Sequence, residues 1–269
     1  MLVSVMVMPF LSPGALAQDQ ASPSPAQGAP ARATVQEILD RPELFIDSRL
    51  ARVKDVAVEP EPLSTRNTRA QLLFSPQAAG RINRHTLLKL GSSCILLQTG
   101  QMLVSGRQDA CTSSLRVSVR GTNYILEAFE NGDAAVTSLE GRLDVVSYLD
   151  GQPGGPPAVV LESGQRLRLL LGAGLTTVVP LSSADYRAIL KGPLFNGFQE
   201  RLPSQGALDD YLRANVPGVA LPSQAPRADG PRAPSPIRFG FGFGFGGSRS
   251  RPDQERQIRP DSTPSQYPR

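Results

Sequence analysis

The chain has 269 residues, which is enough for one large domain or two small ones. Several stretches are too polar to fold, so we expect one ordered body of roughly 150 to 180 residues. The formal net charge is +4, carried almost entirely by arginine, with lysine only at Lys54, Lys89 and Lys191. A basic balance favours anionic partners, but a GC-rich genome gives the same bias. With no tryptophan, the core must use Leu, Val, Ile and Ala.

Residues 1–17 predict an export signal. They are apolar and end in Ala15-Leu16-Ala17 before the polar Gln18, as at a signal-peptide cleavage site. No Lys or Arg precedes the apolar run, and a start upstream of Met1 would account for that departure. The competing interpretation is a buried N-terminal strand. The run is too short and too broken by prolines to span a bilayer. We therefore expect an exported protein of the periplasm or cell envelope without a transmembrane segment.

The two cysteines, Cys94 and Cys111, suit an oxidising compartment. A bridge between them would close a short loop and stabilise the fold by about 3 kcal/mol. Two buried free thiols or part of a metal site are the alternatives. A zinc site is disfavoured because His85 is the only histidine and no CxxC motif occurs. We expect a disulfide, with no metal or other cofactor.

The first elements after the signal are a linker and a helix. Residues 18–32 are rich in Pro, Ala, Ser and Gln, a composition typical of disorder. Thr34-Val35-Gln36-Glu37 has the pattern of a capping box, with Thr34 as the N-cap and Glu37 as its partner. This pattern predicts a short helix through Leu39, which Pro42 ends.

From Leu44 the pattern changes to short apolar runs separated by turn residues. About ten such runs predict an all-β body, a sandwich or a solenoid-like stack, rather than an α/β fold. Asn131-Gly132 predicts a type I′ hairpin, which needs a positive φ at both central residues. Glycines at 100, 106, 121, 141 and 164 mark other corners. The expected strands are 50–53, 70–74, 86–90, 94–98, 101–105, 115–119, 124–129, 134–139, 143–148, 158–161 and 167–171.

The last part of the chain predicts two helices and a tail. Residues 182–185 can cap a helix that ends near Lys191, with Gly192 after it and Pro193 blocking continuation. A second short helix is expected at 207–213. Residues 217–269 are rich in Pro, Gly, Ser and Arg and predict disorder, including a Phe-Gly alternation at 239–247. Arginines beside aromatics can hold single-stranded nucleic acid, but export argues against that partner.

The run Ser118-Val119-Arg120-Gly121-Thr122-Asn123-Tyr124 resembles the strand, Arg-Gly-Thr corner and aromatic strand of the FecR domain family. Residues 135–145 resemble the strand-turn repeat that follows, and 160–165 resemble its closing element. Residues 51–55 and 80–91 are similar to the extended form in cyanobacterial relatives. The resemblance covers roughly residues 44–170. It implies a FecR-like β domain at 33–180, with its core at 44–170, followed by a helical extension at 181–216.

The corner motif of this resemblance has a physical role of its own. Gly121 and Gly141 stand between alternating strands, where a tight corner needs a residue without Cβ. The hydroxyl of Thr122 can cap the turn. We therefore interpret Arg120, Gly121, Thr122, Gly141 and Gly164 as structural rather than catalytic. Three later arginines form either an anion-binding stripe or a solvated strand face: Arg142, Arg166 and Arg168.

Little in the sequence indicates catalysis. His85 lies beside a turn, and no GxSxG, HExxH, P-loop or GxGxxG motif occurs in a strand–helix context. We expect a non-enzymatic module that binds an envelope protein or a polysaccharide. The alternative is a periplasmic sensory component whose signalling parts lie on separate chains, and a cryptic envelope hydrolase is the least favoured reading. FecR regulators carry a cytoplasmic anti-sigma segment and a membrane helix, and their iron-signalling role is not carried over because this sequence shows neither.

Overall fold

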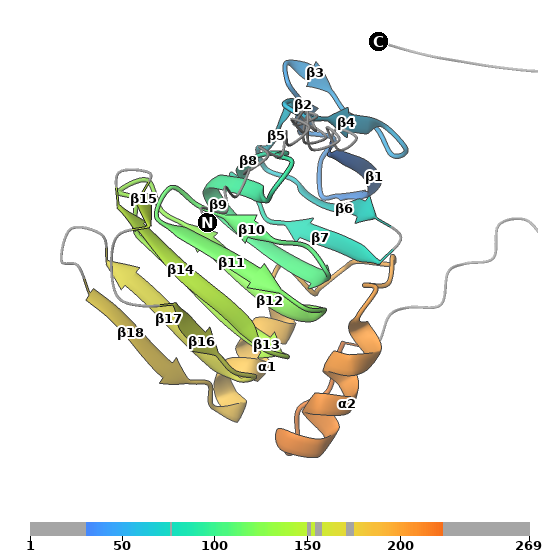
Figure 1. Ribbon diagram of the computed structural model, residues 1–269. Coiled ribbons are helices and arrows are strands. Elements are labelled where there is room, and N and C mark those ends of the chain that lie inside the picture. The colour runs from blue at the N-terminus through green and yellow to red at the C-terminus, as the bar shows by residue number, and fades with distance from the viewer. Residues whose placement is uncertain (1–30, 76, 150–151, 154–157, 171–174, 223–269) are drawn as a thin grey trace, which may run out of the picture. The chain divides into compact units, whose positions relative to one another are not determined.

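The computed structural model describes residues 31–75, 77–149, 152–153, 158–170 and 175–222. The predicted signal peptide, most of the predicted linker and the tail from residue 223 lie outside the described residues. Figure 1 shows strands followed by two helices. The strands are β1 (Arg32–Leu39), β2 (Leu44–Ile46), β3 (Arg49–Leu50), β4 (Val56–Val58), β5 (Pro62–Thr65), β6 (Arg69–Ser75), β7 (Ala78–Ile82), β8 (Leu87–Lys89), β9 (Ile95–Gly106), β10 (Ala110–Cys111), β11 (Leu115–Val119), β12 (Thr122–Ala128), β13 (Ala134–Glu140), β14 (Leu143–Leu149), β15 (Gln152–Pro153), β16 (Val159–Leu161), β17 (Gln165–Leu170) and β18 (Leu175–Pro180). The helices are α1 (Ser183–Lys191) and α2 (Gln205–Asn215).

The described body is mostly β, as the sequence predicts, and all of its strands except β15, which pairs only with β14, form two sheets that lie face to face. Sheet A has the order β4-β1-β6-β7-β9-β12-β13-β17-β18. Sheet B has the order β3-β2-β5-β8-β9-β10-β11-β14-β16. Pairing is antiparallel except between β9 and β10. Strand β9 belongs to both sheets, so it joins them through one continuous backbone.

The central strands of sheet A are buried on both faces, so the body has three layers there. Met102 of β9 and Leu126 of β12 point into the core between the sheets, where residues of both sheets pack together. Leu103 and Ile125, their neighbours along the strands, point to the other face and pack against the helices and the segments around them. Successive side chains of a strand alternate between faces, so a central strand covered on both sides reads as an unbroken apolar run.

Glycines with a positive φ mark the places where the chain passes between the sheets. Gly100, inside β9, Gly106, Gly121, Gly141 and Gly164 have φ angles of 97°, 101°, 99°, 86° and 76°. These values lie in the left-handed region, which glycine enters without a steric cost. Each such turn carries the chain from one layer to the other.

The N-terminal helix predicted from Thr34 to Leu39 is wrong, because these residues belong to β1. Ala33 and Val35 are buried in the core and alternate with more exposed neighbours, as in a strand. The carboxylate of Glu37 accepts hydrogen bonds from the backbone N–H groups of Gln199 and Glu200 instead of capping a helix. Tertiary pairing with β4 and β6 therefore overrides the local capping pattern.

The hairpin at Asn131-Gly132 is not of type I′. Only Gly132 has a positive φ there, at 84°. Its N–H donates to the carbonyl of Phe129, and the N–H of Phe129 donates to the carbonyl of Asp133. The loop therefore has three residues, 130–132, the arrangement of a turn followed by one left-handed residue.

The helices after β18 begin near the predicted positions. Ser182 is the N-cap of α1, and it forms a capping box with Asp185. Gly192 follows the helix, although its φ of −75° is not left-handed. The predicted second helix is longer than expected, running from Gln205 to Asn215.

The disulfide between Cys94 and Cys111 is confirmed, with its Cα atoms 5.9 Å apart. It joins the residue before β9 to the end of β10. These two strands are the parallel pair, whose register places Ile95 opposite Ala110. The bridge therefore fixes the one parallel pairing among the described strands.

Candidate functional site

Strand β18 forms a free edge of sheet A. It pairs with β17 over six residues, from Leu175 to Pro180, and no other described strand pairs with its opposite side. Its sequence, Leu-Thr-Thr-Val-Val-Pro, contains no charged side chain. An edge strand presents unpaired backbone N–H and C=O groups, and charged residues are a common means of preventing another strand from adding there. This edge has no charged residue, and a proline, Pro180, stands only at its end.

Apolar side chains are exposed around this edge. Val178 lies opposite the buried Leu167 of β17, so it points to the interior of the sandwich. It is nevertheless 40% exposed, because no described strand lies beyond β18 to cover it. Three further apolar side chains at this end are more than one third exposed: Val160, Leu170 and Val179.

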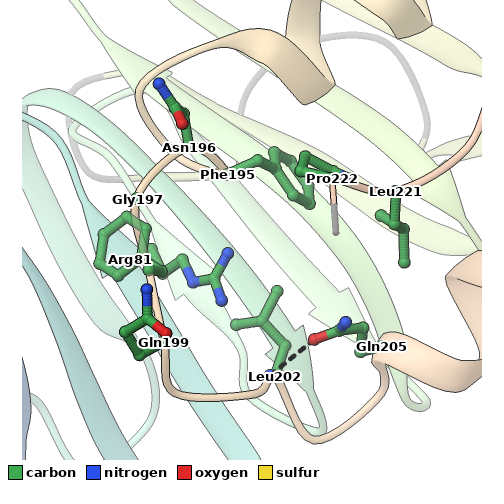
Figure 2. Close-up of a pocket in the computed structure, with 10 residues that line it drawn as sticks. Arg81, Phe195, Asn196, Gly197, Gln199, Leu202, Gln205, Leu221 and Pro222 are labelled. Carbon is green, nitrogen blue, oxygen red and sulfur yellow. Dashed lines mark hydrogen bonds between the residues drawn. The ribbon is translucent and has the colours of Figure 1, made fainter. Parts of the chain in front are cut away.

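A second site is a cavity on the outer face of sheet A, beneath the segment that joins the two helices (Figure 2). The segment between α1 and α2 carries Phe195 and Phe198, which are buried against the sheet. The cavity has a volume of about 230 Å³. Its lining contains one cation and no acid: Arg81, Phe195, Asn196, Gly197, Phe198, Gln199, Leu202, Gln205, Leu221 and Pro222.

Two arginines on neighbouring strands hold this segment against sheet A. Arg69 of β6 makes two hydrogen bonds to the Asp40 carboxylate, at 2.8 Å each, and also donates to the carbonyls of Pro193 and Asn196. Arg81 of β7 donates to the carbonyls of Leu194 and Glu200 at 3.2 and 2.8 Å. The backbone oxygens of an irregular segment are thus satisfied by side chains of the sheet.

The two arginines differ in their charge partners. Hydrogen bonding with Asp40 raises the pKa of Arg69, and the same bonds lower the pKa of Asp40. Arg81 is 2% exposed and has no ion pair among the described residues. Burial lowers its pKa to about 10, and the more distant charge of Glu37 offsets only part of that effect. Arg69 is therefore neutralised locally, and Arg81 is not.

The arginines predicted as a possible anion-binding stripe do not all come together. Arg166 and Arg168 share the outer face of β17, where Arg166 donates to the hydroxyl of Thr137 at 2.9 Å. Arg142 immediately precedes β14 of the other sheet, and its guanidinium is 3.9 Å from the Glu162 carboxylate. The structure therefore does not bring the three together in one stripe, and the solvated strand face stays the other interpretation of these residues.

The corner motif lies apart from both sites. Gly141 donates its N–H to the hydroxyl of Ser163 and accepts from that of Ser138, which ties the β13–β14 corner to its neighbours. Arg120 is exposed. The expected cap by Thr122 is not formed, because its buried Oγ1 has no hydrogen-bond partner in the described part of the chain. None of these residues lines the cavity at Arg81.

His85, the single histidine of the sequence, does not line the cavity at Arg81. His85 is exposed and has a left-handed φ of 54° in its turn. Within the described residues, no group of three or more His, Cys, Asp or Glu side chains is placed to hold a metal ion. Likewise, no helix in the described ranges is long and apolar enough to cross a membrane.

No protein-family model matches the chain, and no curated protein matches it, so membership of the FecR family stays a prediction. Two crystal structures of a "putative anti-sigma factor from Parabacteroides distasonis" are similar to it at 14% and 16% identity. Each match covers 56% of this chain and 73% of the other, with TM-scores of 0.40 and 0.39. The likeness is distant.

Proposed function

We propose that this protein is a non-catalytic, exported interaction module that binds another protein of the cell envelope by adding one of the partner's strands to β18. The observation that carries this proposal is the free edge of sheet A, which is six residues long and uncharged. A protein partner fits both readings of the sequence, the scaffold, which would bind an envelope protein or a polysaccharide, and the sensory component.

The chemistry of the edge favours a protein over a polysaccharide. Main-chain hydrogen bonds provide the affinity when an extended peptide joins a sheet, and pockets for alternate side chains provide the specificity. Val178 and Val179 place partly exposed apolar groups on the two faces of β18. An added strand with apolar residues on its core-facing side would cover Val178 and complete the end of the core.

The disulfide supports the proposed compartment. Structural disulfides form and persist in oxidising environments such as the periplasm, and are rare in the cytosol. The bridge between Cys94 and Cys111 therefore agrees with the export signal predicted from residues 1–17.

The experiment uses the full chain and two matched variants. Val178→Lys places a charge on the core-facing side of the β18 edge, where it blocks strand addition and reaches solvent by its long stem. Val56→Lys is the control, because Val56 is 38% exposed, close to the 40% of Val178, but lies on β4. Envelope proteins captured by each form are identified by mass spectrometry.

A single protein recovered with the parent chain and with Val56→Lys, but lost with Val178→Lys, supports the proposal. That partner should also slow hydrogen exchange at the backbone amides of β18. A partner retained by Val178→Lys overturns it. If sedimentation shows that the purified chain dimerises and that Val178→Lys abolishes the dimer, the occupant is a second copy, and the proposed partner is wrong.

A further inference from the structure

The guanidinium of Arg81 is a buried charge that forms no ion pair with any carboxylate in the part of the chain that the structure describes. It uses three of its five N–H donors, on neutral oxygens: the side-chain carbonyl of Gln71 and the backbone carbonyls of Leu194 and Glu200. Buried charges in proteins are normally paired, because their desolvation is costly. The nearby Glu37 carboxylate is instead engaged by the N–H groups of Gln199 and Glu200.

The cavity extends from this unpaired charge. Figure 2 shows the Arg81 side chain reaching toward the space between Phe195 and Leu202, with Gln205 and Leu221 beyond. One face of the guanidinium is occupied by the Phe198 ring, whose centroid is 4.4 Å away. The cavity thus has a cationic end and apolar walls, and its lining contributes no carboxylate that would repel an anion.

Arg69 is a comparable arginine in the same protein whose charge is paired with a carboxylate. It lies on the adjacent strand, contacts the same segment, and also has Phe198 within cation–π distance, at 5.7 Å. It differs in having the Asp40 carboxylate in bidentate contact, the geometry in which arginine binds carboxylates most strongly. Arg81 is likewise a buried cation in contact with an aromatic ring. Where Arg69 contacts the Asp40 carboxylate, however, Arg81 borders the cavity.

We infer that the cavity at Arg81 binds a small organic carboxylate, whose anionic end pairs with the guanidinium and whose apolar body packs against Phe195 and Leu202. A cavity of about 150 Å³ is known to accept benzene. The volume of about 230 Å³ here therefore has room for an aromatic ring and a carboxylate. This site is separate from the β18 edge and does not depend on the proposed function.

Benzoate is the probe, and benzamide, which has the same shape without the charge, is its matched control. Each is titrated into the full chain and followed by calorimetry and by thermal unfolding. We expect benzoate to bind saturably and to raise the unfolding temperature, and benzamide to bind at least about tenfold more weakly. Equal binding of the two compounds, or no binding of benzoate, overturns the inference.

Two substitutions test the site itself. Arg81→Met keeps an apolar stem of similar length and should weaken benzoate binding at least about tenfold. Because that variant also loses three hydrogen bonds and can fail to fold, Gln205→Glu provides an independent test. It keeps the side-chain oxygen that accepts from the Leu202 N–H and places a carboxylate at the cavity, so it should compete with benzoate while preserving the fold.

Two further variants separate this site from the rest of the molecule. Val178→Lys should leave benzoate binding unchanged, since β18 does not line the cavity. Asp40→Asn removes the carboxylate that pairs with Arg69 and leaves Arg81 unchanged. It should change benzoate affinity by less than about twofold. Retained benzoate binding in folded Arg81→Met, or in Gln205→Glu, contradicts the assignment.

Discussion

The two ends of the sandwich differ in how their edge strands are protected against pairing with another strand. At the N-terminal end, formed by β1 to β5, the edge strands β3 and β4 have only two and three residues. The Arg49–Asp55 ion pair lies beside them, and a proline, Pro60, follows β4. At the C-terminal end, formed by β16, β17 and β18, the edge of sheet A is six residues long and uncharged. Figure 1 shows these ends on opposite sides of the body.

This difference indicates that the two ends serve different purposes. Short strands, charges and prolines at an edge are the devices by which proteins prevent unwanted pairing. Their use at one end shows that this chain contains the means to protect an edge. β18 is longer, carries no charge and has a proline only at its end, Pro180, so it is the better candidate for a contact surface, and the N-terminal end is better suited to holding the fold together.

The largest expected effect concerns the corners. Gly106 and Gly164 both have a positive φ, so alanine is strained at either by about 1 to 2 kcal/mol. A Cβ on Gly106 would also overlap the backbone oxygen of Gln77, which cannot move away alone. At Gly164, toward the C-terminal end, the nearest atoms are the hydroxyls of Tyr211 and Tyr186, at 3.0 and 3.1 Å.

We expect Gly106→Ala to cost about 4 kcal/mol of unfolding free energy and Gly164→Ala about 1 to 2 kcal/mol, measured by denaturant titration. Equal costs at the two corners would show that the C-terminal end is packed as tightly as the rest, which would weaken the contrast between the ends.

A smaller effect is expected from the ion pair between Asp40 and Arg69, whose guanidinium also donates to the segment between the helices. Asp40→Asn keeps the side-chain shape and tolerates the φ of 70° at this position, but removes the charge that pairs with Arg69. Because the pair is partly buried, Asp40→Asn should lower the free energy of unfolding by about 2 kcal/mol. This value lies between those for exposed and for buried ion pairs.

The pH dependence of stability provides a second measurement of this pair. Hydrogen bonding to Arg69 lowers the pKa of Asp40 below its ordinary value of 3.8, so its contribution is present above that pH and is lost as the pH falls through the lower, folded-state pKa. Asp40→Asn should flatten the acid side of the stability curve. If stability falls with decreasing pH as steeply in Asp40→Asn as in the parent chain, then other carboxylates dominate acid unfolding and the prediction for Asp40 is wrong.

The smallest expected effect is that of the edge substitutions on stability. Val178→Lys and Val56→Lys replace partly exposed valines at the two ends and should each change the unfolding free energy by no more than about 0.5 kcal/mol. Thermal melts of the two variants should therefore nearly coincide. A large loss for Val178→Lys alone would show that Val178 is a core residue and that the edge is not free for pairing.

The fold class was readable from the sequence because alternation and turn residues are local signals. Leu115–Val119 alternates strictly and is found as β11 with those bounds. The capping pattern at Thr34 was equally local, but the helix that it predicted does not form. β1 is stabilised instead by pairing with β4 and β6, and a short stretch of sequence does not reveal that pairing. β7, with its sequence Ala-Ala-Gly-Arg-Ile, has weak strand propensity and forms because it lies between β6 and β9.

The sites were harder to predict than the fold. The cavity combines Arg81 with residues more than one hundred positions later, and nothing in the sequence reports that proximity. A signal for β18 was present, since Thr176 to Val179 is a run of β-branched residues typical of a strand. Its position at an edge, however, depends on the order of strands in the sheet.

Strand β9 has a consequence for the specificity of folding. Its first part pairs with β8 and β10 in sheet B, and its last part pairs with β7 and β12 in sheet A. A shift of one residue in a strand exchanges its inward and outward side chains. Because β9 is continuous, such a slip would misplace Leu97 in one sheet and Met102 in the other at the same time. Any misaligned state therefore loses core contacts in two layers together, and this doubled penalty favours a single alignment of the whole body.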